Sequence, residues 1–536
     1  MQPKSSRRHF VGGAAAASLT ALLPEGLFSQ GSTAQSVVVR PGSEIGIVRP
    51  EFHSNFAEHL GSCVYGGIWV GKDSPIPNIG GYRKAAVDAL KELGIPVLRW
   101  PGGCFADNYH WRDGIGPVEK RPRRVNMNWA NAVEESSFGL HEFIGFCRLI
   151  GAEPYLSVNV GSGTPQEALD WIEYCNFPKG TTLADERIAN GSPEPFRVRY
   201  WGVGNEAWGC GGRMTPQHYA DVYRQFSNYM RTFGGTVPFL IACGPNQNDA
   251  NWTRGFFGGM IGTRGPSGFA MHYYQNGSLP ATQFTADAMD QQLSIFHSLE
   301  QAIEYQRTLI DSFTPPPAAG RGRGGPAGGR GPAPRVALVV DEWGVWDRSV
   351  PEEIEKYGQL WQQSTMRSAV AAGLGLNIFN RQADKLYMCN IAQMVNVLQS
   401  LLLTDGPQGQ HCVRTTTYHA FAMYKAHRSK MSVKVDSGAK EPLDLSMSAS
   451  KSGSELVISF VNPKAGAGIR VDCSLDGHAA RSATAQIMTH KDFNAANTFG
   501  NPNAIVPQPH PVRASGTSVA LDLPPMSVVT ATVQLG

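Results

Sequence analysis

The sequence lacks three features that mark common functional classes: a large net charge, a membrane-length apolar segment and closely spaced cysteines. Lys and Arg number 47 and Asp and Glu number 44, so the net charge is +3. Such a balance gives no support for binding to nucleic acid or to an anionic membrane. The apolar run at residues 11–23 is shorter than the about 20 residues of a membrane-spanning helix. The nine cysteines include no C-x-x-C pair, which disfavours a zinc site or a disulfide framework.

Two groups of enzyme motifs are also absent. The glycines in "GVGNEAWG" and "RWPGG" do not continue into G-x-G-x-x-G or into a phosphate-binding loop that ends in Lys-Ser or Lys-Thr. The sequence has no G-x-S-x-G element of the kind that serine hydrolases use. We therefore interpret these glycines as room for the backbone at the rim of a fold rather than as a nucleotide site.

Residues 1–34 differ in character from the rest of the chain. Arg7 and Arg8 precede a short apolar run, and the small residues "STA" at 32–34 offer a cleavage site. This pattern resembles a twin-arginine export signal, and the alternative is a frayed N-terminus with a chance arginine pair. We expect export to the periplasm or the medium. Because such passengers fold in the reducing cytoplasm, we expect mostly free, buried thiols, although one or two disulfides remain compatible with nine cysteines.

Apolar runs alternate with amphipathic segments between residues 50 and 430. Near-continuous apolar runs indicate strands that are buried on both faces, as in a parallel sheet. We identify eight such runs, at residues 63–70, 95–103, 153–161, 199–206, 238–246, 268–275, 336–344 and 374–382. The segments between them carry helix signals, such as Thr-Pro starts at 164–165 and 215–216 and a closing Gly94. Eight strands that alternate with helices predict a (β/α)₈ TIM barrel.

The barrel contains one compositionally unusual insertion, residues 314–335, which consists almost entirely of Pro, Gly, Ala and Arg. Such a segment cannot bury a core and is predicted to be disordered. An RNA-binding role for its Arg-Gly repeats is an alternative. Its predicted position between the sixth helix and the seventh strand is at the bottom face, away from the active-site end of such barrels.

Short β-rich runs separated by Gly, Asn, Pro and Asp follow from residue 431 to 536. They predict a C-terminal antiparallel β-sandwich. Residues 35–49 form a further predicted strand that precedes the barrel. We expect this strand to join the sandwich, because the termini of such chains often meet.

Two glutamates, Glu206 and Glu342, end the fourth and seventh predicted strands, where a barrel of this type carries its functional groups. Glycoside hydrolysis requires two carboxyl groups of different pKa, one as general acid and one as nucleophile or base. A strand-end salt bridge is the alternative for either residue alone. Trp208 and Trp343 are expected to adjoin and tune the two carboxyl groups, whereas Asp341 is as well suited to face the barrel wall.

Aromatic residues that could stack on sugars are frequent near the same strand ends. They are Trp100, Tyr109, Trp111, Trp129, Tyr274 and Trp346. His272 is expected to hydrogen-bond a sugar or a carboxylate, with a core position as the alternative. A zinc-ligand role for His272 is disfavoured, because no His or Cys stands at metal-binding spacing from it.

Several long motifs in order, among them "FAEHLGSCVYGGIW", "LRWPGGCFADNYHWRDGIGP", "WGVGNEAWG", "DEWGVW" and "NIAQMVNVLQSLLLTDG", resemble the α-L-arabinofuranosidases of glycoside hydrolase family 51. The resemblance implies a retaining exo-enzyme without metal or organic cofactor that acts on arabinan, arabinoxylan or their oligosaccharides, and a homo-oligomer is compatible with it. Glu206 would be the acid/base and Glu342 the nucleophile. The sugar pocket would contain Glu58, Arg99, Trp129, Asn205, His272, Tyr274, Trp346 and Gln393. Alternatives are an endoglucanase or β-xylosidase on the same barrel, or a non-catalytic carbohydrate-binding protein.

One position departs from the pattern of the family. Many members have Asn after the paired glycines of "PGG", where this sequence has Cys104. A thiol is a weak hydrogen-bonding group, so Cys104 is a less effective sugar ligand than Asn. We expect Asp107 to compensate for this loss.

Overall fold

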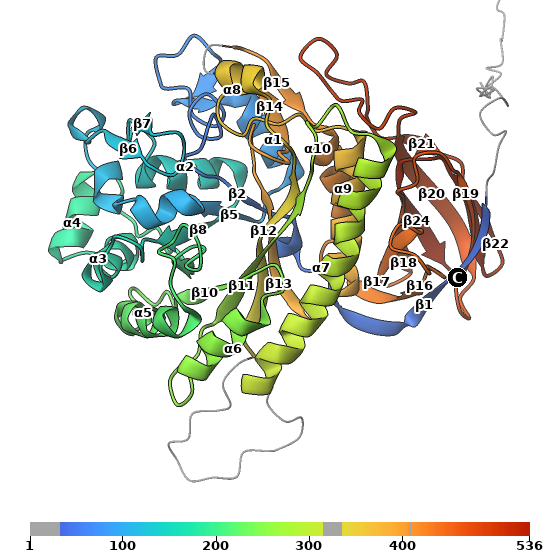
Figure 1. Ribbon diagram of the computed structural model, residues 1–536, viewed down its shortest axis with the longest axis horizontal. Coiled ribbons are helices and arrows are strands. Elements are labelled where there is room, and N and C mark those ends of the chain that lie inside the picture. Colours follow the sequence, from blue (N-terminus) through green and yellow to red (C-terminus); the bar gives the residue numbers. More distant parts are fainter. Residues whose placement is uncertain (1–32, 315–334, 407–408) are drawn as a thin grey trace, which may run out of the picture.

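The computed structural model describes residues 33–314, 335–406 and 409–536 (Figure 1). Most of the predicted export signal and nearly all of the predicted insertion at 314–335 lie outside the described residues. Thr33 and Ala34, the last two residues of the predicted signal, pair with Ile469 and Arg470 as the start of a strand. The described residues contain no helix that is both long and apolar enough to cross a membrane.

Eight parallel strands close into a barrel, which confirms the predicted (β/α)₈ architecture. The strands are β2 (Ser54–Phe56), β5 (Val97–Trp100), β8 (Glu153–Val158), β9 (Tyr200–Val203), β10 (Phe239–Asn246), β11 (Gly268–Asn276), β12 (Ala337–Trp346) and β13 (Leu386–Ala392). The pairing order β10-β11-β12-β13-β2-β5-β8-β9 returns to its start. The carboxyl ends of all eight strands therefore meet at one face.

Two of the eight strand predictions are wrong. Residues 63–70 form turns around Gly66, whose φ is +80°, and the barrel strand is instead β2, which begins with polar Ser54 and Asn55. Residues 374–382 continue helix α9 (Met366–Arg381), and the eighth strand is β13. Helix α9 is buried along nearly its whole length, so its apolar run has the same sequence pattern as a buried strand.

Helices cover the outside of the barrel. They are α1 (Lys84–Leu93), α2 (Leu140–Ile150), α3 (Pro165–Asn176), α4 (Thr182–Ala189), α5 (Pro216–Tyr229), α6 (Ala250–Gly259), α7 (Ala286–Phe313), α8 (Pro351–Tyr357), α9 and α10 (Thr416–Tyr424). The predicted caps are present: Thr164 Oγ1 accepts from Glu167 N, Thr215 Oγ1 accepts from His218 N, and Gly94 closes α1 with a φ of +68°.

Short 3₁₀ helices and two-stranded ribbons connect the main elements. The 3₁₀ helices are η1 (Pro50–His53), η2 (Cys104–Asn108), η3 (Trp111–Gly114), η4 (Val118–Lys120) and η5 (Lys425–His427). The two-stranded ribbons are β3 (Asn78–Ile79) with β4 (Tyr82–Arg83), β6 (Arg124–Asn126) with β7 (Ala132–Glu134), and β14 (Leu402–Thr404) with β15 (Cys412–Arg414). The β6–β7 hairpin matters for the site, because its tip carries Trp129.

The second domain is a ten-stranded sheet with its own hydrophobic core (Figure 1, red-brown, beside β1 in blue). Its strands are β1 (Thr33–Ile47), β16 (Met431–Asp436), β17 (Ser446–Ser452), β18 (Glu455–Asn462), β19 (Ile469–Ser474), β20 (Ala480–Thr489), β21 (Gln508–His510), β22 (Arg513–Ser515), β23 (Ser518–Leu523) and β24 (Ser527–Leu535). Strand β1 pairs antiparallel with β16 and parallel with β19. The predicted antiparallel sandwich thus contains one parallel pair, because β1 reaches it from the other end of the chain.

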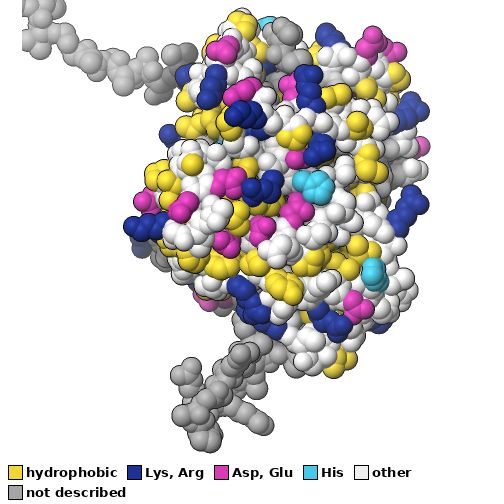
Figure 2. All heavy atoms as spheres, turned by 90° about the vertical axis from the view of Figure 1, so that its left-hand side faces the viewer, with side chains coloured by type: hydrophobic (Ala, Val, Ile, Leu, Met, Phe, Trp, Pro, Cys, Tyr) yellow, Lys and Arg dark blue, Asp and Glu magenta, His cyan; other side chains and the backbone are white. Residues whose placement is uncertain are grey.

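Helix α9 connects the two domains through polar contacts. Asn377 and Asn380 donate to the hydroxyl groups of Ser446 and Ser448, and Arg381 donates to the carbonyl of Met447. On the outer surface seen in Figure 2, basic and acidic side chains are interspersed. This face therefore shows no extended patch of one charge among the described residues.

Candidate active site

Glu206 and Glu342 converge at the carboxyl end of the barrel. Glu342 lies within β12, and Glu206 follows β9 by a turn in which Gly204 and Glu206 have positive φ angles of 86° and 40°. This turn directs the Glu206 side chain back over the barrel mouth. One carboxylate oxygen of Glu206 and one of Glu342 lie within 4.8 Å of each other. The two carboxyl groups are therefore close enough to act on one bond.

The environment of Glu342 favours its ionised form. Arg99 Nη1 donates to Oε1 at 2.7 Å, and the Tyr274 hydroxyl donates to Oε2 at 2.6 Å. Burial opposes ionisation, but His272 and Arg99 outweigh it and hold the pKa of Glu342 below its usual value. Glu342 is thus suited to the role of a nucleophile.

His272 bridges the two carboxylates. Its Nδ1 lies 2.9 Å from Glu206 Oε1 and 3.6 Å from Glu342 Oε2. Burial alone would lower the pKa of His272, but Glu342 and Glu206 raise it above its usual value. The expected carboxylate contact is therefore present. Glu206, His272 and Glu342 are near enough to hold a metal ion, but their polar atoms already satisfy one another as ion pairs.

Arg99 connects Glu342 to the base of the site. Its Nη2 donates to Asn205 Oδ1 at 2.6 Å, and its Nε lies 3.3 Å from Asp341 Oδ2. The register between β11 and β12 shifts at Asp341, so that Asp341 and Glu342 both reach Arg99. Asp341 accepts hydrogen bonds from Tyr155 and Asn390 within the barrel. Asp341 thus supports Arg99 rather than facing the site.

Glu58 forms a second acidic centre beside Glu342. Its carboxylate accepts from Trp129 Nε1 at 2.9 Å, Gln393 Nε2 at 3.2 Å and the amide of Phe105 at 3.0 Å. Burial, followed by the charge of Glu342, raises the pKa of Glu58 to about 7. The side chains of Trp129 and Gln393 are therefore held at the same wall of the site as Glu58.

The paired glycines of "PGG" are required because acidic side chains of the site lie close to their backbone. A Cβ on Gly102 would lie 2.7 Å from Cγ of Glu58, and one on Gly103 would lie 3.0 Å from Glu342 Oε1. Any larger residue would displace an acidic side chain of the site. These glycines thus provide the backbone room that their pattern indicates.

The expectation for Cys104 requires correction. Cys104 forms a disulfide bond with Cys210, so it has no thiol that could hydrogen-bond a sugar. Cys210 Sγ lies 3.4 Å and Cys104 Sγ 3.9 Å from Glu206 Oε2. The other seven cysteines are free, and six of them are buried. Cys210 was missed because its sequence position reveals no partner: 106 residues separate it from Cys104.

Asp107 does not compensate for the missing Asn in the expected way. Its carboxylate accepts hydrogen bonds from the amides of Val160, Gly161 and Asn205 at 2.8–3.0 Å. Burial raises the pKa of Asp107 to about 7 although these amides oppose the shift. Asp107 therefore holds the loops after β8 and β9 in place and has no free face toward a sugar.

The expected aromatic lining is only partly present. Tyr274 and Trp346 are in edge-to-face contact with centroids 5.1 Å apart, and Trp129 contacts Glu58. Trp100, Tyr109 and Trp111 instead lie in the core of the barrel. Trp343 points outward, because side chains alternate along a strand; it packs against Phe379 of α9. Trp208 adjoins the site loop and donates to the carbonyl of Gly244 at 3.1 Å.

Comparisons with known proteins agree with this geometry. Residues 89–292 match the family model "Alpha-L-arabinofuranosidase 1 domain", and residues 341–527 match "Alpha-L-arabinofuranosidase C-terminal domain". The chain is 39% identical to an intracellular exo-alpha-L-arabinofuranosidase of Bacteroides ovatus over 95% of this chain and 97% of that protein.

Solved structures give the same result. The GH51 arabinofuranosidase of Xanthomonas axonopodis pv. citri is similar with a TM-score of 0.86 and 37% identity, over 94% of this chain and all of that one. The arabinose complex of the Thermotoga maritima α-L-arabinofuranosidase is similar with a TM-score of 0.79 and 30% identity, over 94% and 100% of the chains. The chain is a glycoside hydrolase and belongs to the α-L-arabinofuranosidases of family GH51.

Proposed function

We propose that this enzyme removes terminal α-L-arabinofuranosyl residues with retention of configuration. The separation of Glu206 and Glu342 oxygens, within 4.8 Å, carries this proposal. Retaining glycosidases hold their carboxyl groups about 5–5.5 Å apart, whereas inverting enzymes leave about 6.5–9.5 Å for a water molecule. Arabinan, arabinoxylan and their oligosaccharides are the proposed substrates.

The site supports a division of labour between the two glutamates. Glu342, kept ionised by Arg99 and His272, attacks the anomeric carbon as the bond to the leaving oxygen breaks. Glu206 donates its proton to that oxygen, and an arabinosyl ester of Glu342 results. Glu206 then removes a proton from a water molecule that attacks the ester. The second displacement frees arabinose and restores both glutamates.

The remaining polar groups at the mouth are proposed to bind the sugar. Asn205 shares Arg99 with Glu342 and is suited to a hydroxyl beside the anomeric carbon. Glu58 and Gln393, beside Glu342, offer further hydroxyl partners, and Trp129 and Trp346 offer apolar faces.

Azide rescue tests the two roles. With an aryl arabinofuranoside that has a good leaving group, Glu206→Ala should accumulate the ester, and azide should release it as an arabinosyl azide of retained configuration. Glu342→Ala should give the azide of inverted configuration. The proposal fails if either variant hydrolyses the substrate at the wild-type rate, or if the wild-type product initially has inverted configuration by NMR.

A panel of arabinofuranoside, xyloside and glucoside substrates tests the sugar preference.

We also propose that residues 1–34 direct export, on the basis of Arg7, Arg8 and the apolar run that follows. Cell fractionation of the full chain and of a variant with both arginines changed to Lys tests this proposal. Equal cytoplasmic retention of the two proteins would contradict it.

A further inference from the structure

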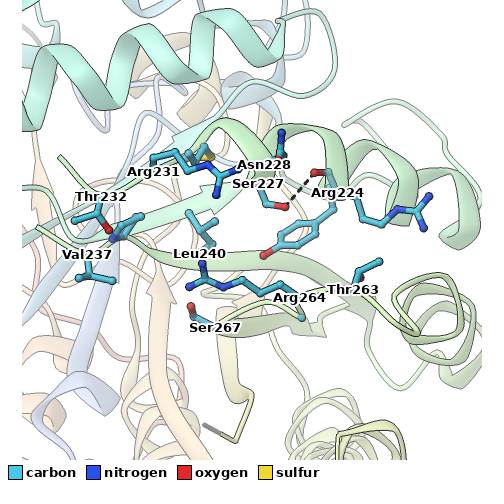
Figure 3. Close-up of a pocket in the computed structure, with 14 residues that line it drawn as sticks. Arg224, Ser227, Asn228, Arg231, Thr232, Val237, Leu240, Thr263, Arg264 and Ser267 are labelled. Atoms are coloured by element: carbon cyan, nitrogen blue, oxygen red, sulfur yellow. Dashed lines mark hydrogen bonds between the residues drawn. The ribbon is translucent and has the colours of Figure 1, made fainter. Parts of the chain in front are cut away.

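A pocket of about 680 Å³ lies at the opposite end of the barrel from the candidate active site (Figure 3). It is formed beneath α5 by the loop from α5 to β10 and the loop from α6 to β11. These loops precede strands, so they belong to the bottom face of the barrel, where catalytic groups are not found. Its volume is within the range of about 300–1,000 Å³ that is typical of small-molecule sites.

Three arginines and no acidic residue line this pocket. They are Arg224, Arg231 and Arg264. In Figure 3 the guanidinium groups of Arg231 and Arg264 extend into the pocket on either side of Leu240, whereas Arg224 extends away from them. Both groups are therefore available to an anion that lies between them.

The charge partners of the three arginines differ. Arg224 pairs with Asp221 at 2.5 Å and donates to the carbonyl of Gly259. Arg231 donates to the neutral amide of Asn228 at 2.7 Å. Within residues 33–314, 335–406 and 409–536, Arg264 has no ion pair. Arg231 and Arg264 are thus available for an external anion, and Arg224 is not.

The rest of the lining is suited to a polyhydroxylated ligand. Ser227, Asn228, Thr232, Thr263 and Ser267 contribute polar side chains, and Val237, Pro238 and Leu240 contribute an apolar wall. A guanidinium group binds a carboxylate through two parallel hydrogen bonds. A sugar that carries a carboxylate would use both parts of this lining, whereas inorganic phosphate would use only the arginines.

We propose that this pocket binds a uronic acid residue of an acidic saccharide, with its carboxylate between Arg231 and Arg264. The inference deepens the proposed function, because a second site for an acidic sugar would keep the enzyme on a polysaccharide that carries both arabinose and uronic acids. The pocket is separate from Glu206 and Glu342, so binding of the acidic sugar should not depend on catalysis.

Titration calorimetry or saturation-transfer NMR with the full enzyme tests the proposal. The ligand is D-glucuronate, D-glucose is the neutral control, and inorganic phosphate is the control anion. We expect glucuronate to bind more tightly than glucose and phosphate. Arg231→Ala and Arg264→Ala should each weaken glucuronate binding at least tenfold. Arg224→Ala removes the same charge from the same pocket and should change the affinity less than twofold.

Absence of glucuronate binding, equal losses in all three variants, or phosphate binding as tight as glucuronate binding would overturn the proposal. Circular dichroism and the thermal midpoint verify that each variant is folded. All three variants should hydrolyse a small aryl arabinofuranoside at the wild-type rate. Failure of the wild-type enzyme in that assay would instead contradict the proposed function, so the two failures are distinguishable.

Discussion

The imidazole of His272 lies 2.9 Å from Glu206 through Nδ1, and the same nitrogen lies 3.6 Å from Glu342. A single imidazole thus connects the proposed acid/base with the proposed nucleophile. Removing it would leave the buried carboxylate of Glu342 close to the half-buried carboxyl group of Glu206 with no histidine between them. His272 is therefore expected to be a positioning residue whose charge keeps Glu342 ionised.

We expect His272→Gln to lower kcat/KM by about tenfold to a hundredfold, because a hydrogen bond between charged groups contributes about 1.5–3 kcal/mol. His297→Gln, at an exposed position of α7, should leave kcat/KM unchanged. The acidic limb of the pH–rate profile should move to higher pH in His272→Gln only. An unmoved limb would show that His272 does not control the ionisation of Glu342.

The same histidine predicts a pH dependence of stability. The pKa of His272 is raised above 6.5 in the folded enzyme, so its contribution is complete below that value and disappears as the pH rises through the folded-state pKa. Urea unfolding of the wild type should therefore show a loss of stability as the pH rises above 6.5 that His272→Gln lacks. Parallel pH profiles for the two proteins would contradict the shift.

The raised pKa of Glu58 predicts a second pH dependence of stability. Its pKa is raised from 4.5 to about 7, so the folded state prefers the protonated form and loses stability between these two pH values. Glu58→Gln should remove this loss and be more stable than wild type at pH 8, by on the order of 3 kcal/mol at most. Activity should nevertheless fall, chiefly through a higher KM. Urea unfolding and steady-state kinetics test both statements, with Glu119→Gln on the exposed helix η4 as the control.

The disulfide between Cys104 and Cys210 connects the loop after β5 to the loop that carries Glu206. We expect the double variant with Ser at both positions to lose about 2–5 kcal/mol of stability, because the bond restricts the unfolded chain. Dithiothreitol should lower the thermal midpoint and the activity of the wild type and of Cys412→Ser, but not of the double variant. Insensitivity of the wild type to the reductant, with reduction verified by thiol titration, would contradict this role.

Two tryptophans on β12 should separate stability from substrate binding. Trp343→Ala should cost about 3–5 kcal/mol, because the ring is fully buried against α9. Trp346→Ala should leave stability within about 1 kcal/mol but raise KM, because this ring adjoins Tyr274 at the mouth. The thermal midpoint and KM of both variants test the assignment, and it fails if Trp343→Ala raises KM while leaving stability unchanged.

The sequence by itself determined the barrel architecture and the placement of Glu206 and Glu342 at one face of the barrel. Buried parallel strands give apolar runs, and helix caps give local signals, so the alternation of elements could be read without tertiary information. Because carboxyl ends of barrel strands meet at one face, Glu206 and Glu342 could be placed together from their positions alone.

Only the tertiary structure decided which neighbours these residues have. The strand β2 is too short and polar to be recognised, and α9 is too apolar to be distinguished from a strand, since both patterns result from packing against distant segments. The pairing of Cys104 with Cys210, the amide contacts of Asp107 and the outward direction of Trp343 likewise depend on contacts between residues far apart in the chain. Local patterns report the path of the backbone, whereas the partner of each side chain is set by the closure of the barrel.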